Sequence, residues 1–127
     1  MKHTSKRPEP TVKTKRAAAQ LAAAKEAVDE AANAQTLAIK DLDRADRIYQ
    51  KADDALDACL SKTIRAFKKG ALDSTAVGNI RMYGASTAEA RLFAETTYAT
   101  LTIARERLDK AEAALARAIA RQNDPNL

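Results

Sequence analysis

Residues 11–69 read TVKTKRAAAQLAAAKEAVDEAANAQTLAIKDLDRADRIYQKADDALDACLSKTIRAFKK and contain neither glycine nor proline. Most of these residues favour helices. Large side chains recur every seven residues from Leu21, and alanine recurs every seven residues from Ala24. This heptad is typical of a coiled coil in which one core position is large and the other small. The large positions, called a, are Leu21, Val28, Gln35, Leu42, Tyr49, Leu56 and Thr63; the small positions, called d, are Ala24, Ala31, Ala38, Ala45, Ala52, Cys59 and Ala66.

A second heptad pattern occupies the C-terminal part of the chain and ends before Pro125. Ser86 and Glu89 form a capping box at its start, in which each side chain bonds the main-chain amide of the other residue. We therefore expect a second helix at residues 86–122. Its small positions are Ala90, Thr97, Ala104, Ala111 and Ala118, and its large positions are Ala94, Leu101, Leu108 and Leu115.

The three glycines of the chain all lie between the two patterns, within residues 70–85. We interpret this segment as a connector, with Gly70 ending a first helix at residues 12–69 and Asp73, Ser74 and Thr75 capping one short turn. Pro8 and Pro10 disfavour a helix before it, so residues 1–11 are expected to form a disordered basic tail. Residues 123–127 form a C-terminal tail.

The predicted fold is all-α: a long antiparallel helical hairpin, built as an alanine-rich coiled coil and expected to dimerise into a helical bundle. Helices 12–69 and 86–122 joined by residues 70–85 leave the first helix longer than its partner by about 20 residues. This overhang would pair with a second copy, fold back as a third helix, or bind another partner; we favour the homodimer. Its interface residues would be Leu21, Ala24, Val28 and Ala31.

The charge of the chain is concentrated at one end. The formal net charge is +5, and residues 1–16 alone carry six Lys or Arg against one Glu, so the rest of the chain sums to zero. A second group of basic residues lies near the connector, beside the aromatic residues Phe67 and Tyr83. Basic groups next to aromatic ones suit contact with nucleic-acid backbone and bases, although the same lysines also suit the C-terminal end of a helix.

Catalytic and metal-binding patterns are not evident. His3 is the only histidine and falls in the expected tail, and Cys59 occupies a small core position. The acidic residues between Asp41 and Asp57 alternate with Lys and Arg, which is typical of a solvated helix face. We therefore expect a protein that is not an enzyme and that holds no metal or cofactor.

The leading hypothesis is a cytoplasmic coiled-coil binding protein, an accessory or regulatory factor that associates with nucleic acid through its basic tail and hairpin tip. The alternative is a protein–protein adapter or inhibitor that docks through the overhang or the acidic face. The single cysteine is compatible with a reducing compartment, and no apolar run suggests a membrane span. The candidate nucleic-acid-binding residues are Lys2, Lys6, Arg7, Lys13, Lys15, Arg16, Lys62, Arg65, Lys68, Lys69, Arg81 and Tyr83.

Overall fold

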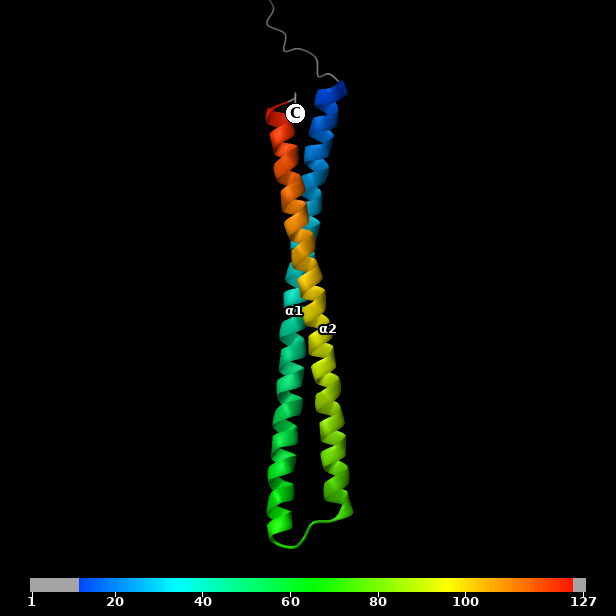
Figure 1. The fold of residues 1–127 in the computed structure, drawn as a ribbon, viewed down its shortest axis with the longest axis vertical. Coiled ribbons are helices and arrows are strands. Elements are labelled where there is room, and N and C mark those ends of the chain that lie inside the picture. Colours follow the sequence, from blue (N-terminus) through cyan, green and yellow to red (C-terminus); the bar gives the residue numbers. More distant parts are fainter. Residues whose placement is uncertain (1–11, 125–127) are drawn as a thin grey trace, which may run out of the picture. The chain divides into compact units, whose positions relative to one another are not determined.

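Two helices make up almost all of residues 12–124, the part of the chain that the structure, a computed structural model, describes. Helix α1 spans Val12–Lys68 and helix α2 spans Ser74–Asn123, with no strand in the described range. The helices run in opposite directions and pack against each other, which confirms the predicted all-α helical hairpin (Figure 1). The predicted tail at residues 1–11 lies outside the described residues.

Burial along α1 follows the predicted heptad. The small positions Ala31 and Ala45 are fully buried and Ala38 is nearly so, while the large positions on either side, such as Leu42 and Tyr49, are half-buried. The alanine row is therefore the side of α1 that faces α2. Small residues in this row let the facing helix approach closely. The facing helix then partly covers the large side chains at the neighbouring a positions.

The C-terminal end of α1 is closed by glycine, as predicted. Gly70 has a positive φ of 70°, the left-handed conformation that residues with a Cβ rarely adopt. The Gly70 amide donates to the Phe67 carbonyl at 3.0 Å, and the Ala71 amide donates to the Ala66 carbonyl at 2.8 Å. These two bonds form a Schellman motif, which satisfies carbonyls that the helix itself leaves free.

The predicted connector at residues 70–85 is wrong, because α2 already begins at Ser74. Asp73 is its N-cap: the Asp73 Oδ1 atom accepts from the Ala76 amide at 2.9 Å. Gly78 and Gly84 lie inside the helix, where each costs about 1 kcal/mol relative to alanine. The heptad offsets that cost, because it continues through half-buried residues of the supposed connector, namely Ala76, Ile80 and Tyr83.

The earlier start of α2 also removes the predicted overhang. The chain divides into two compact units, which we call the terminal unit (described residues 12–34 and 105–124) and the connector unit (residues 35–104). In the terminal unit the Arg121 Nη1 atom donates to the Gln20 Oε1 atom at 3.3 Å, so α2 accompanies the first turns of α1. Because the connector is shorter than predicted, each residue of α2 faces a different residue of α1 from the one expected. The described part of α1 therefore has no segment of about 20 residues that lacks α2 beside it.

The interface expected on the overhang loses its basis for the same reason. Ala31 is fully buried within the single chain, and Leu21, Ala24 and Val28 are half-buried on the same side of α1. These residues therefore lie on the side of α1 that faces α2.

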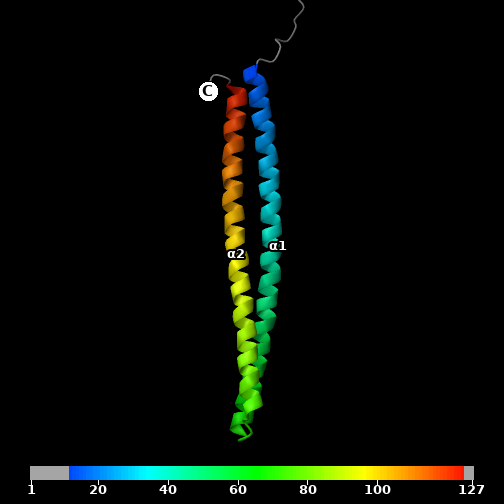
Figure 2. The same ribbon diagram turned by 90° about the vertical axis from the view of Figure 1, so that its right-hand side faces the viewer.

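The core of the connector unit is small. Ala38, Leu101 and Ala104 are buried together, and Leu42 packs against them, so leucines meet alanines here as the heptads predict. Leu101 is the one large side chain that is buried among the described residues. A polar contact also joins the two helices: the Thr87 hydroxyl, which donates to the Tyr83 carbonyl of its own helix at 2.9 Å, lies 3.2 Å from the Ala52 carbonyl of α1. In this unit α1 and α2 lie side by side in both views (Figure 2).

Replacing Asp73 by alanine is expected to destabilise the protein by about 0.5–2 kcal/mol, since the Ala76 amide loses its acceptor at the start of α2. Urea unfolding followed by circular dichroism measures this loss. Ser74→Ala is the matched control, because Ser74 is exposed and follows the cap. A larger loss for Ser74→Ala than for Asp73→Ala would contradict the assignment of Asp73 as the cap.

Candidate nucleic-acid interface

Four basic residues occupy the last turns of α1 and the residue after it. Lys62, Arg65, Lys68 and Lys69 are all exposed. Part of their placement is structural, because cations near a helix C-terminus are favoured by the partial negative charge there. Whether these four residues also form a binding surface depends on where their side chains lie at the hairpin end.

Three of the four surround a single hollow, which we call the basic hollow. Lys62, Arg65 and Lys69 line it together with Ala66 and Ala71, and its volume is about 370 Å³. No carboxylate belongs to this lining, but Asp73 lines an adjoining hollow that shares Lys62, Ala66 and Ala71 with it. Three cations around a small alanine floor present hydrogen-bond donors and positive charge to an anionic group such as a phosphate.

The other residues predicted for the hairpin tip do not line the basic hollow. Arg81 is exposed on α2, and Tyr83 is half-buried at a heptad position that faces α1. Phe67 is 68% exposed but is likewise absent from the lining. The expected combination of cations with stacking aromatics is therefore not brought together in this hollow, which is suited to backbone contact and not to base stacking.

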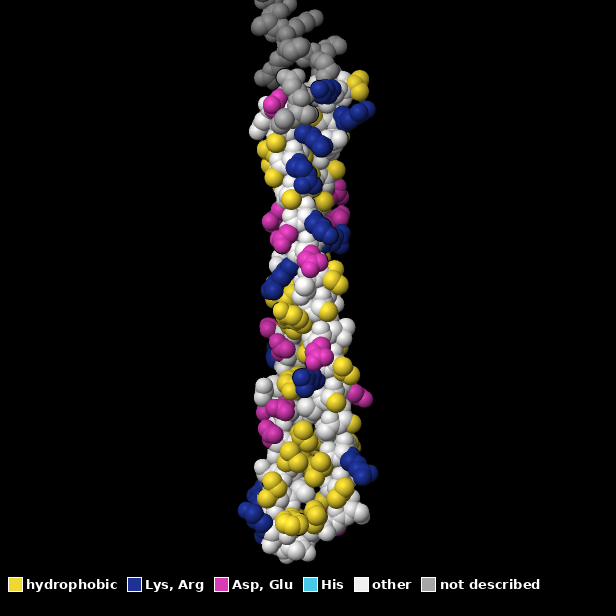
Figure 3. Space-filling model, viewed as in Figure 1, with side chains coloured by type: hydrophobic (Ala, Val, Ile, Leu, Met, Phe, Trp, Pro, Cys, Tyr) yellow, Lys and Arg dark blue, Asp and Glu magenta, His cyan; other side chains and the backbone are white. Residues whose placement is uncertain are grey.

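Apolar side chains are also exposed at this end of the connector unit. They are Leu60, Ile64, Phe67, Leu72, Val77 and Met82. Figure 3 shows hydrophobic side chains gathered over both helices near the connector, with Lys and Arg side chains at the outer edge of α1. The hairpin end thus presents a charged part and an apolar part.

The basic residues at the start of the chain belong to the terminal unit. Lys13, Lys15 and Arg16 are exposed on the first turns of α1. Lys2, Lys6 and Arg7 lie outside the described residues. None of the three described cations forms an ion pair within the described part of the chain, so their charge is available to an external anion.

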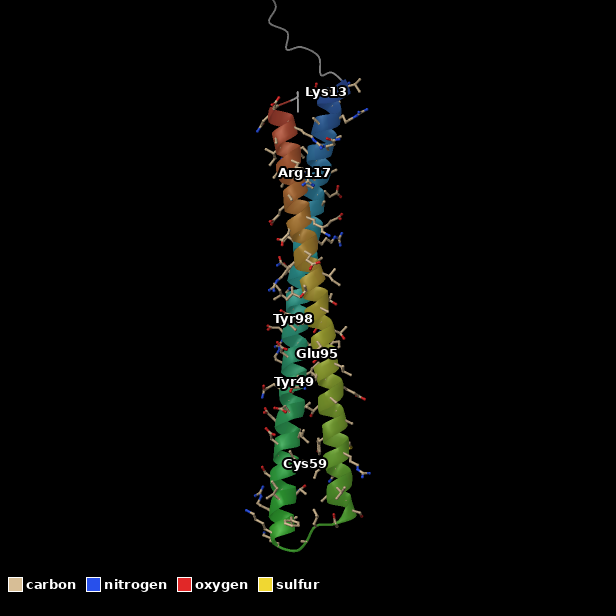
Figure 4. All side chains as sticks on the ribbon, in the orientation of Figure 1. Lys13, Tyr49, Cys59, Glu95, Tyr98 and Arg117 are labelled. Atoms are coloured by element: carbon tan, nitrogen blue, oxygen red, sulfur yellow. The ribbon has the colours of Figure 1, made fainter. Side chains whose placement is uncertain are left out.

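A further surface feature does not follow from the sequence pattern. Two adjoining hollows of about 700 and 420 Å³ lie along the connector unit and share Tyr49, Arg91 and Glu95 in their linings. Tyr49, Glu95 and Tyr98 are labelled in Figure 4, where α1 supplies the first and α2 the other two. Arg91 and Glu95 form an exposed ion pair, with 3.2 Å between Nε and Oε1. Tyr98 flanks the heptad core position Leu101, and that placement was the available signal in the sequence.

The acidic stretch of α1 is a solvated face. Its aspartates form no ion pair with the interleaved Lys and Arg within residues 12–124; Asp54 instead accepts from Gln50 Nε2 at 3.0 Å. The described residues contain no group of three or more His, Cys, Asp or Glu placed to hold a metal. Cys59 is half-buried at its predicted small position. Neither described helix is apolar enough over a sufficient length to cross a membrane.

Comparison with protein-family models, with curated proteins and with solved structures finds no match to this chain. The function must therefore be inferred from the charges and surfaces of the hairpin itself.

Proposed function

We propose that this protein is a non-enzymatic helical hairpin that binds nucleic acid through its basic hollow and its basic N-terminal segment. The observation that carries the proposal is that Lys62, Arg65 and Lys69 line one open hollow in which cations are the only charged residues. An accessory or regulatory role in a nucleoprotein complex fits such a protein, because its exposed cations supply charge to an anionic partner.

The expected mode of binding is contact with the phosphate backbone. Each phosphate neutralised by Lys or Arg releases condensed counterions, and binding then weakens steeply as salt is added. Backbone contacts carry no direct sequence information. Because the aromatic residues do not line the hollow, we expect weak sequence preference from this site and similar affinity for duplexes of different sequence.

The triple variant Lys62→Ala, Arg65→Ala, Lys69→Ala tests this role of the basic hollow. Fluorescence anisotropy with a labelled DNA or RNA duplex at several salt concentrations should show weaker binding. It should also show a log–log salt slope that is smaller by about 3, one unit for each lost phosphate contact. The three residues are exposed, so the fold should survive their replacement.

The matched control removes the same number of charges elsewhere in the connector unit. Lys40→Ala, Arg44→Ala, Lys51→Ala changes three exposed cations of the acidic stretch and should leave the salt slope close to that of the parent protein. If both triple variants lost the same affinity and salt slope, the effect would come from the net charge of the protein and not from the basic hollow. No binding by the parent protein at low salt would end the proposal.

A second candidate function is binding to another protein, and the apolar part of the hairpin end favours it. Ile64, Phe67 and Met82 are exposed near the connector, where apolar patches commonly mark protein interaction sites. Phe67→Ser separates the two functions. Under nucleic-acid binding it leaves the affinity for a duplex almost unchanged, whereas under protein binding it removes the anchor of the interface.

A further inference from the structure

We infer that a second copy of this chain docks in the groove formed by the two adjoining hollows of the connector unit, here called the tyrosine groove. Its lining comes from both helices and includes Leu42, Tyr49 and Leu56 on α1 and Gly84, Arg91 and Tyr98 on α2. The inference rests on packing and surface area, and it is independent of the proposed nucleic-acid binding.

The first support is the amount of surface that the single chain leaves exposed. Most large hydrophobic side chains of the described residues are exposed or half-buried, and among them only Leu101 is buried. A homodimer interface removes roughly 1,000–2,500 Å² from each copy. These side chains can supply apolar surface to such an interface, and the small core gives a reason to form one.

The identity of the occupant follows from the same observation. Leu101 alone among the large described side chains is buried, while Tyr98 and many others remain exposed. A hairpin with so little buried apolar surface gains most from a partner that is present whenever the chain folds. Another copy of the chain always meets this condition.

The second support is Gly84. It lies inside α2, where glycine is unfavourable, yet a Cβ placed on it would meet nothing within 4 Å. The contacts of the single chain therefore give no reason for a glycine. Gly84 borders the tyrosine groove beside Ala88, and a residue without a side chain at this point allows the backbone of another helix to come close.

The charges of the tyrosine groove favour a copy of the same surface over a uniformly charged partner. Asp46 and Glu95 line it together with Arg91, so both signs are present in one lining. In an isologous dimer the same patch is used by both subunits, and a patch with both signs is complementary to itself across a two-fold axis. A nucleic acid would meet two carboxylates in this groove.

Molar mass in solution tests the inference, measured by light scattering on the full chain at micromolar concentrations. The parent protein should have twice the 13.7 kDa mass of one chain. Gly84→Leu fills the groove and should raise the dimer dissociation constant roughly tenfold or more by overpacking the interface. Gly78→Leu is the control, because Gly78 also has open space around it but borders neither hollow.

Each result decides. A dimer that Gly84→Leu weakens and Gly78→Leu leaves within about twofold supports the tyrosine groove as the interface. A monomeric parent protein, equal weakening by both variants, or an unaffected Gly84→Leu dimer would each overturn it. Circular dichroism shows whether each variant remains helical.

A second pair of variants covers the case in which Gly84→Leu does not fold. Tyr98→Ala removes a groove side chain that is 57% exposed in the single chain, so it should weaken the dimer without disturbing the hairpin. Ile103→Ala removes an exposed side chain that lines neither hollow and should leave the dimer intact. A Tyr98→Ala dimer as tight as the Ile103→Ala dimer would contradict the assignment.

Discussion

Replacing Leu101 by alanine is expected to destabilise the protein by about 2–5 kcal/mol, the cost of removing a large side chain from a packed site and leaving a cavity. Leu101 is only 2% exposed and lies with Ala38, Leu42 and Ala104 in the core of the connector unit. Its neighbours are mostly alanines, whose short side chains cannot move in to fill the space. Chemical denaturation with a fixed denaturant slope measures the loss.

Ile103→Ala is the control for this experiment. Ile103 is two residues away on the same helix but is 65% exposed, so its truncation should change stability by no more than about 0.5 kcal/mol. If the two truncations cost the same, Leu101 would not be the centre of the core, and the burial pattern of the hairpin would be wrong.

Enlarging a buried alanine should also be costly. Ala45→Leu is expected to destabilise the protein by about 1–3 kcal/mol, because the site is fully buried in the row that faces α2 and has no room for three more carbon atoms. Ala104→Leu, at a nearly buried small position of α2, should behave alike. Thermal melts of both variants followed by circular dichroism give the change.

The control for the enlargement is Ala58→Leu. Ala58 is exposed on α1, and leucine favours helices nearly as well as alanine, so the melting midpoint should stay close to that of the parent protein. A midpoint for Ala45→Leu that is unchanged or raised would show that the helices are not tightly packed at the alanine row.

The sequence was sufficient to predict the hairpin because its periodicity is local information. The alanines of α1 recur at strict intervals, and their burial at Ala31, Ala38 and Ala45 follows directly from that repeat. Gly70 was equally readable, because a glycine after a long uninterrupted helical segment is a common C-terminal signal.

The connector differs from the sequence-based prediction because periodicity outweighs the glycines in this segment. Gly78 and Gly84 suggested a loop, whereas Ala76, Ile80 and Tyr83 already continue the heptad of α2. Burying one helix face outweighs a helix propensity cost of about 1 kcal/mol at each glycine. The same error produced the overhang, since the length of the connector sets which residues of the two helices face each other.

The candidate interface was predictable in part. The spacing of Lys62, Arg65 and Lys69 already places them on one face of a helix, but the contribution of Ala71 to the same hollow depends on how the chain leaves α1 at Gly70. The tyrosine groove could not be predicted from the sequence, because Tyr49 and Tyr98 come from different helices. Their approach depends on the register that the short connector imposes.

The tight turn between α1 and α2 also sets the order in which contacts between the helices form during folding. The Thr87–Ala52 contact closes a loop of 35 residues, whereas the Arg121–Gln20 bond closes one of 101. Closing the longer loop directly from the unfolded chain costs about 1 kcal/mol more in chain entropy. Pairing should therefore begin beside Gly70 and proceed along the two helices, and the contacts around Gln20 and Arg121 should be the last to form and the first to separate.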